Sequence, residues 1–345
     1  MSLHKPFYTI KDYSLDEYQA LSKSAVIVNF PNSGILKFHG NDSLDLLNRL
    51  STNNLDHLQI NQGVQTVITS NKGKFLDILR VFRIENYLLV FTSLNNEIDV
   101  MKHIDFFTFS EDVVVEKVTE KKCLYKTSGP RSNDLMDKLF GKLFGAISLY
   151  NVLETSIENH KIKIIRTDFL KQLGYEIIGN IKSKEILDSK LSKIVENSDF
   201  EFANLEAIEA FRILNGIPAF GKELTNKYNP LEGNLINFIS FNKGCYVGQE
   251  VIARLNTYNK VQNTLCLIEF KSTQNYEKPP HNLYVGGKQF GVLTSVSKTP
   301  HDESYIGMAY VSKKSSALFE IKNFEAELLP KEKILVSSIK PVEPI

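Results

Sequence analysis

The chain has no tryptophan and only three cysteines, Cys123, Cys245 and Cys266, in 345 residues. A sparse and odd set of cysteines argues against a disulfide framework and is typical of a reducing compartment, so we expect a cytoplasmic protein. The cysteines and the seven histidines show no metal-ligand spacing, and we predict no metal site. Because four thiolates normally hold an iron–sulfur cluster, the chain alone is not expected to hold one in that way.

The chain also lacks an excess of charge and a long apolar run. Its 41 basic and 40 acidic residues give a formal net charge of +1, which provides no long-range attraction to nucleic acid or anionic membranes. No stretch approaches the roughly 18 apolar residues that span a bilayer, and residues 1–14 lack the apolar core of a signal peptide. We therefore expect no nucleic-acid partner and no membrane partner.

An internal repeat is present. Residues 40–50 read GNDSLDLLNRL, residues 129–139 read GPRSNDLMDKL, and a short apolar segment precedes each copy. Both copies place leucines along one stripe of a helix. Two unrelated amphipathic helices can match by chance, but the shared glycine and the preceding strand favour a duplicated α/β unit. We predict two such subdomains, near residues 35–120 and 121–215.

The remaining pattern predicts an α+β fold with two domains. Helical periodicity is seen at 94–109, and strand-like segments bounded by turn residues lie at 64–70, 74–84, 87–93, 161–167 and 175–179. From about residue 262, short apolar runs separated by proline and glycine are typical of a small antiparallel barrel or sandwich. We place a first domain at 1–261 and a C-terminal β-barrel domain at 262–345.

The segment FNKGCYVGQEVIAR, residues 241–254, carries the most distinctive chemistry. Cys245 lies between two glycines, which let a backbone approach a ligand closely, and two residues after Lys243. A nearby cation favours the nucleophilic thiolate, so we predict catalytic roles for Cys245 and Lys243. Free cysteines usually behave as small buried hydrophobes. That interpretation suits Cys123 and Cys266, which lie in apolar strand-like runs, better than Cys245.

Residues 243–250, KGCYVGQE, resemble the signature octapeptide of the YgfZ family, folate-binding relatives of the glycine-cleavage T-protein that include iron–sulfur assembly proteins. The blocks GILKFHGNDSLDLLNRLSTN, TSNKGKFLDILRVFRI, RTDFLKQLGYEI and EAFRILNGIPAFGKEL follow the order of that family, so the resemblance covers roughly residues 26–320. It implies a T-protein-like multi-domain fold, with duplicated α/β subdomains around a central cavity for tetrahydrofolate and a C-terminal antiparallel β-barrel.

The resemblance also implies cofactor-binding residues. Glu176, in GYEI, matches a carboxylate that meets the amino-pyrimidine edge of the pterin, where paired hydrogen bonds give specificity. Phe169 stands where relatives often have tyrosine and can stack on a ring, and Arg212 matches a helix arginine that lines the same cavity. Tyr246 and Gln249 of the octapeptide are further predicted cofactor contacts. The alternatives are a surface glutamate at a strand end and an exposed arginine paired with its i−3 glutamate.

Asp77 lies in GKFLDILRV, where aminomethyltransferases have GGILDD, and the resemblance implies a role near the folate amine in one-carbon transfer. Strand alternation places Phe75, Asp77 and Leu79 on one face, so we expect partial burial, which suits general acid/base work as well as cofactor binding. The alternative is a strand residue that faces solvent.

Two departures distinguish the chain from T-proteins: it has KQLG at 171–174 in place of a GEDG-type turn, and it carries the cysteine octapeptide. The leading hypothesis is a tetrahydrofolate-binding accessory protein that assembles or repairs iron–sulfur clusters in client enzymes. Cys245 would act near the mouth of the chamber that Glu176 lines, as nucleophile, redox group or shared cluster ligand. Its partners would be reduced folate and iron–sulfur client or assembly proteins. The alternatives are a folate-dependent aminomethyltransferase and an interaction scaffold with a vestigial folate cavity.

Overall fold

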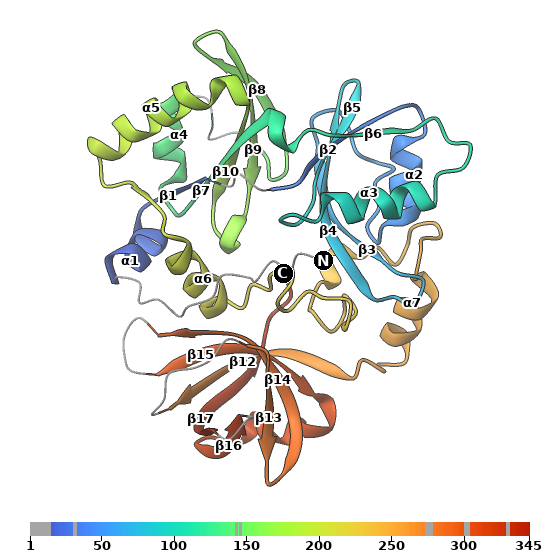
Figure 1. The fold of residues 1–345 in the computed structure, drawn as a ribbon, viewed down its shortest axis with the longest axis vertical. Coiled ribbons are helices and arrows are strands. Elements are labelled where there is room, and N and C mark those ends of the chain that lie inside the picture. The colour runs from blue at the N-terminus through green and yellow to red at the C-terminus, as the bar shows by residue number, and fades with distance from the viewer. Residues whose placement is uncertain are drawn as a thin grey trace, which may run out of the picture.

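Two α/β units and a closed β-barrel form the structure, a computed structural model that describes residues 15–29, 33–141, 144, 147–272, 279–299, 304–328 and 332–345. Figure 1 shows the three parts arranged around a common centre, with the barrel below the two units. Within the described residues, no helix is both long and apolar enough to cross a membrane.

The first unit is a five-stranded sheet with the order β3-β4-β5-β2-β6. Its elements are β2 (Ile35–His39), α2 (Ser43–Leu50), β3 (Gly63–Thr69), β4 (Phe75–Ile84), β5 (Tyr87–Phe91), α3 (Glu97–Phe106) and β6 (Val114–Lys117). The predicted leucine stripe of α2 (Leu46, Leu47 and Leu50) is buried together with residues of α3 and the sheet. Burial of this apolar face attaches both helices to the sheet.

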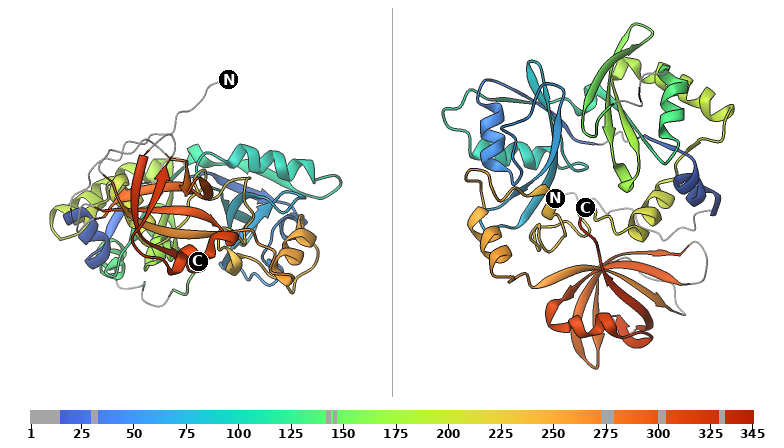
Figure 2. Two further views of the ribbon diagram at one scale, coloured as in Figure 1. Left: turned by 90° about the horizontal axis from the view of Figure 1, so that it is seen from below. Right: turned by 180° about the vertical axis from the view of Figure 1, so that it is seen from behind.

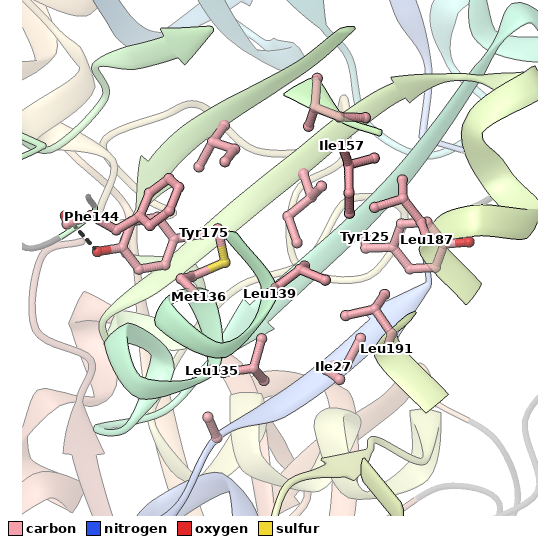
Figure 3. Close-up of a cluster of buried hydrophobic side chains, with 14 of the residues drawn as sticks. Ile27, Tyr125, Leu135, Met136, Leu139, Phe144, Ile157, Tyr175, Leu187 and Leu191 are labelled. Carbon is pink, nitrogen blue, oxygen red and sulfur yellow. Dashed lines mark hydrogen bonds between the residues drawn. The ribbon is translucent and has the colours of Figure 1, made fainter. Parts of the chain in front are cut away.

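The second unit is a six-stranded sheet with the order β11-β1-β7-β10-β9-β8. Its elements are β1 (Val26–Asn29), β7 (Lys122–Ser128), α4 (Ser132–Phe140), β8 (Val152–Ile157), β9 (His160–Thr167), β10 (Gly174–Asn180), α5 (Lys184–Glu196) and β11 (Glu201–Phe202). Figure 3 shows its core, in which leucines of α4 and α5 pack on the sheet. The Tyr175 hydroxyl donates to the Phe144 carbonyl at 3.2 Å and is therefore satisfied inside this core.

The two units repeat one topology, which confirms the predicted duplication. In each, the second, third and fourth strands are followed in the sheet by the first and then the fifth, and the second unit adds β1 before its last strand. Gly40 and Gly129 of the sequence repeat both adopt positive φ, at 110° and 130°. A Cβ would lie 1.9 Å from the Asp112 carbonyl oxygen at the first position and 2.4 Å from the Ser24 carbonyl oxygen at the second, so both turns require glycine.

The sheets of the two units face each other across an apolar interface that includes Phe82 and Leu89 of the first unit and Leu124, Ile165 and Ile178 of the second. Helix α6 (Leu205–Leu214) follows the second unit and packs with α1 (Leu15–Lys23), while α7 (Gln249–Thr257) lies beside the first unit in both figures. Short 3₁₀ helices lie at Thr119–Lys121, Phe169–Lys171, Ile181–Ser183, Ile236–Phe238 and Lys313–Glu320.

The C-terminal part is a closed antiparallel barrel with the order β12-β15-β14-β13-β16-β17, which confirms the predicted barrel. Its strands are β12 (Asn263–Lys271), β13 (His281–Val285), β14 (Lys288–Lys298), β15 (Tyr305–Ser312), β16 (Phe324–Leu328) and β17 (Glu332–Pro341). The right-hand view of Figure 2 shows it below the two α/β units, next to α6. Closure leaves none of these strands with an unpaired edge.

Candidate functional site

Glu176 lies in β10, a strand with neighbours on both sides, and its side chain is fully buried. It is directly opposite Lys126 of β7, whose Nζ donates to Oε1 at 2.9 Å. Arg80 of β4 extends from the first unit and donates to the same oxygen. The other carboxylate oxygen, Oε2, is buried and has no hydrogen-bond partner among the described residues. Glu176 is therefore not a surface residue, and it has one oxygen available to accept.

The charges around Glu176 keep it ionised. Burial alone would raise the pKa of this carboxyl, but the charges of Arg80 and Lys126 outweigh that effect and hold the pKa below its usual range. Burial lowers the pKa of Lys126 to about 8, the Arg80 charge acts in the same direction, and Glu176 opposes both. The result is an anion between two cations, with the lone pairs of Oε2 directed at none of the described donors.

Phe169 lies beside this cluster. The Lys126 Nζ is 4.8 Å from the centroid of the Phe169 ring, so the lysine contacts both the predicted stacking ring and the predicted pterin carboxylate. The Tyr150 hydroxyl donates to Asp168, the residue before Phe169, and accepts from the amide of Gln65. Phe169 and Glu176 therefore lie close together, next to a hydrogen-bonded chain of Gln65, Tyr150 and Asp168 that joins the two units.

Asp77 is on the other face of β4 from Arg80, because the two are three residues apart in a strand. It is fully buried, more than the sequence predicted, on the same face as Phe75 and Leu79. Its carboxylate accepts from the Ile78 and Ser93 backbone N–H groups, and from the Asn96 amide at 3.0 Å. Burial raises its pKa to about 6 in spite of these hydrogen bonds.

A cavity of about 380 Å³ lies beside Asp77, between β4, α3 and the loop 220–226. Asn96, the amide partner of Asp77, forms part of its wall together with His103 and Phe220. Nε2 of His103 is buried and has no partner among the described residues, and burial lowers the pKa of this histidine. Asp77 is thus one hydrogen bond away from a cavity that is distinct from the Glu176 cluster.

Arg212 is buried, in contrast to the exposed position considered from the sequence. Its guanidinium donates to Glu209, to Glu223 at 3.0 Å, to Ser295 of the barrel at 2.7 Å, and to the Ile217 carbonyl. All five of its N–H donors are used in this network. The described contacts make Arg212 a buried connection between α6 and the barrel, and its predicted contact with folate stays a prediction.

Cys245 is exposed, whereas Cys123 and Cys266 are buried in sheet strands, as the sequence predicted. The loop that carries Cys245 is anchored on both sides. The backbone N–H of Val247 donates to the Arg49 carbonyl, and the Val247 carbonyl accepts from the Thr69 hydroxyl at 2.7 Å. Gly248 has positive φ, and a Cβ there would lie 2.6 Å from the Ser70 carbonyl oxygen. The close approach that this glycine permits is therefore to the first unit, not to a ligand.

Lys243 anchors the same loop. Its Nζ donates to the carbonyls of Asn48, Ser51 and Asn53 at 2.7, 2.9 and 2.6 Å, so all three ammonium donors hold the C-terminal end of α2. Burial lowers the pKa of Lys243 to about 8. These contacts are structural, and the predicted catalytic assistance to Cys245 stays a prediction.

Tyr246 and Gln249, the two other octapeptide residues predicted to contact the cofactor, flank the anchored segment. Tyr246 is buried in a small apolar cluster with Ile239 and Ile252, and burial raises its pKa to about 12. Gln249 is half-buried and begins α7. Their predicted cofactor contacts stay predictions.

No described contact joins the Cys245 loop to the Glu176 cluster. The Cys245 loop is fastened to Thr69, which lies four residues along β3 from Gln65, and Gln65 pairs with Arg80. Four strand residues span about 13 Å. We expected Cys245 and Glu176 to line one chamber, and no contact among the described residues supports that expectation. The thiol is nevertheless exposed and not packed in the core.

Sequence reasoning missed Arg80 and Lys126, which pair with Glu176, and Tyr150, which binds Asp168 and Gln65. A signal for the first two was present, because each is a cation in a strand segment rich in apolar residues, in LDILRVF and CLYKTS. Such residues are rarely buried unless they are paired. Which carboxylate pairs with them depends on strand register across two units, and that information is not local in the sequence.

The fold and the sequence both have known relatives. The structure superposes on aminomethyltransferase T of the glycine-cleavage system from Bartonella henselae with a TM-score of 0.77 and 19% identity, covering 94% of this chain and 88% of that one. This defines a T-protein fold, as the sequence predicted. Residues 5–243 match the GCVT N-terminal domain, and the chain belongs to that family.

Two relatives illustrate the range of the family. An Arabidopsis thaliana protein named "Putative transferase At1g60990, chloroplastic" is 27% identical over 313 residues, covering 89% of this chain and 69% of the plant protein. An aminomethyltransferase of Thermotoga neapolitana is 25% identical over 324 residues, covering 92% and 88% respectively. These similarities establish the transferase-like superfamily.

Proposed function

We propose that the chain binds a reduced folate, tetrahydrofolate or a one-carbon derivative, at Glu176. The observation that carries this proposal is the ionised and fully buried carboxylate, one oxygen of which has no hydrogen-bond partner among the described residues. A buried acceptor without a partner costs stability, so such groups are retained where a ligand supplies the missing donor. The family of the chain supplies the ligand class, because several of its relatives are aminomethyltransferases.

The residues present fit a pterin. Its amino-pyrimidine edge carries N–H donors that suit Oε2 of Glu176, and Phe169 offers a ring face beside that carboxylate. Arg80 and Lys126 would position the carboxylate from the opposite side through Oε1. The folate itself would supply the capacity to carry a one-carbon unit.

The test is the thermal shift that tetrahydrofolate produces in wild type and in Glu176→Gln. The amide keeps the size of the side chain but replaces one acceptor oxygen by an N–H donor, which faces the donors of the pterin. We expect the ligand to raise the wild-type melting temperature by linkage and to leave the variant at its own unliganded value. An equal rise in both proteins would contradict the proposal.

We further propose that the chain is of the YgfZ type and assists iron–sulfur clusters of client enzymes through Cys245. An exposed thiol on a loop that is anchored on both sides is accessible to a partner protein, which supports this function. Nucleophile, redox group and shared cluster ligand are all compatible with a displayed sulfur.

Cys245→Ser tests the accessory function. In cells that lack the protein, we expect this variant to fail to restore iron–sulfur enzyme activity while it still binds tetrahydrofolate in vitro. Restoration to the wild-type level would exclude a function for the thiol. Loss of folate binding in the same variant would contradict the separation of the two places.

Aminomethyl transfer is the second candidate, and Asp77 favours it. A carboxyl whose pKa burial raises to about 6 is suited to exchange protons near neutral pH. Turnover of an aminomethyl-lipoyl carrier protein with tetrahydrofolate, abolished in Asp77→Asn, would establish this activity. Absence of turnover by wild type would leave the accessory function.

A further inference from the structure

A second cavity, of about 290 Å³, lies at the outer end of the interface between the two α/β units. It is formed by β2 and β5 of the first unit and by β7, β8, β9 and β10 of the second, the strands at the top of Figure 1. Lys122 and Asn180 pair at this end of the β7–β10 ladder, four residues from the pair of Lys126 with Glu176. Four strand residues span about 13 Å, so the cavity is separate from the proposed folate site.

The wall of this cavity is strongly basic, although the chain as a whole is nearly neutral. It includes four lysines, Lys37, Lys122, Lys161 and Lys163, and a single carboxylate, Glu154. That carboxylate is paired with Lys163. Glu116, the nearest acid on the neighbouring strand β6, is paired with Lys121, which does not line the cavity. Glu116 also lies directly opposite Lys37 in the β2–β6 ladder. The wall therefore keeps a net positive charge, although two of its four lysines have a carboxylate close by.

Lys122 is the centre of this cluster. It is half-buried, and its Nζ forms no hydrogen bond or ion pair with any of the residues that the structure describes. Burial lowers its pKa first, the positive charges of Lys37 and Lys163 lower it further, and Glu116 acts in the opposite direction. The Lys37 Nζ lies 4.4 Å above the Tyr87 ring, at the edge of the same cavity.

The apolar part of the wall is formed by Leu89, Ile162, Ile178 and the Tyr87 ring, and His160 and Asn180 are further polar residues of the wall. A cavity of this size is at the lower end of the range for small-molecule sites, which combine apolar surface with polar groups that orient the ligand. A cluster of ammonium groups with a net positive charge favours an anion with more than one charge, and a phosphate provides this at neutral pH.

We propose that this cavity is a binding site for a small organic phosphate, with the phosphate held by Lys122, Lys37 and Lys163 and the organic part placed against Leu89, Ile162 and Ile178. The site is independent of folate binding. Strands of both units line the cavity, so an occupant would contact the two units at once.

The experiment is isothermal titration calorimetry at constant ionic strength with two probes, inorganic pyrophosphate and 1-naphthyl phosphate. Wild type is compared with Lys122→Gln and with Lys193→Gln, which removes an exposed lysine of α5. We expect both probes to bind wild type and Lys193→Gln with equal affinity. We expect at least a roughly tenfold weaker affinity for Lys122→Gln, as removal of a charge-assisted contact produces.

The naphthyl compound is expected to bind more tightly than pyrophosphate, because only it covers the apolar wall. Equal affinity of wild type and Lys122→Gln, or absence of binding to wild type, would overturn the proposal. The melting temperature of unliganded Lys122→Gln should not fall, since the substitution removes repulsion, and this measurement shows that the variant is folded. Glu176→Gln should bind both probes like wild type, which separates this site from the proposed folate site.

Discussion

The Glu176 cluster and the Cys245 loop differ in the exposure of their reactive groups, because the carboxylate is buried and the thiol is exposed. Glu176 is an anion held fully inside the protein by Arg80 and Lys126, and one of its oxygens lacks a partner among the described residues. Cys245 is an exposed thiol that is displayed because its neighbours in the octapeptide are fastened to the first unit. A buried charge is suited to bind a ligand, and a displayed sulfur is suited to meet a partner. The described hydrogen bonds that anchor the octapeptide are with the first unit, and none of them joins it to the Glu176 cluster.

The largest expected effect on stability comes from the buried anion. Glu176→Ala leaves the charges of Arg80 and Lys126 uncompensated, and we expect the free energy of unfolding to fall by about 3–5 kcal/mol. Urea denaturation measures this change. Glu185→Ala, at an exposed position of α5, is the control and should change it by less than about 0.5 kcal/mol. A similar small change for Glu176→Ala would show that the carboxylate is not held between two cations.

The next effect concerns the anchor of the loop. Lys243→Met removes an ammonium that donates to three backbone carbonyls, and we expect the free energy of unfolding to fall by about 3 kcal/mol. Lys260→Met removes an exposed lysine just after α7 and should have an effect below about 0.5 kcal/mol. If both variants were equally stable, the loop would not depend on Lys243. The distinction between Lys243 as the anchor of the loop and Cys245 as its exposed residue would then be wrong.

The third effect depends on pH, and here the substitution is expected to raise the free energy of unfolding at pH 8. The pKa of Asp77 is raised from 3.8 in the unfolded chain to about 6 in the fold, so the folded state binds this proton more tightly. Its contribution is most favourable below about pH 4, and about 2–3 kcal/mol is lost as the pH rises through 6. We expect Asp77→Asn to be more stable than wild type at pH 8 and similar to it at pH 4.

Denaturation curves at both pH values test the titration of Asp77. Asp99→Asn, which changes an exposed carboxylate of α3, is the control and should follow wild type at each pH. Equal stability of Asp77→Asn and wild type at pH 8 would mean that the folded protein does not penalise the ionised carboxylate.

The smallest effect on stability is expected for the displayed thiol. Cys245→Ser should change the free energy of unfolding by less than about 0.5 kcal/mol, because the side chain is exposed. In wild type, mass spectrometry should show that Cys245 is alkylated at least about a hundredfold faster than Cys123 and Cys266, which react only after local opening. Comparable rates for the three thiols would contradict the exposed loop.

The fold was readable from local patterns. The glycine and leucine stripe at 40–50 and 129–139 predicted two equivalent units, and the structure gives both glycines the same type of turn. Alternation in β4 predicted the shared face of Phe75, Asp77 and Leu79. The small strand β1 was not predicted, and its place inside the second sheet depends on pairing with β7 and β11.

The site was only partly readable. Glu176 and Phe169 were predicted from a motif, but the cations that hold Glu176 ionised come from β7 and from the other unit. Their meeting is set by register and by packing of the two sheets. The contacts of Lys243 were also not predictable from the local sequence, because its proximity to Cys245 suggested that it activates the thiol. In the fold its ammonium points to the end of α2.

The most direct test of the central claim is a structure of the chain with bound tetrahydrofolate. We predict that N–H groups of the amino-pyrimidine edge lie within hydrogen-bond distance of Oε2 of Glu176, with the pterin against Phe169. A complex in which the folate lies elsewhere, and Oε2 of Glu176 contacts no ligand atom, would contradict the account.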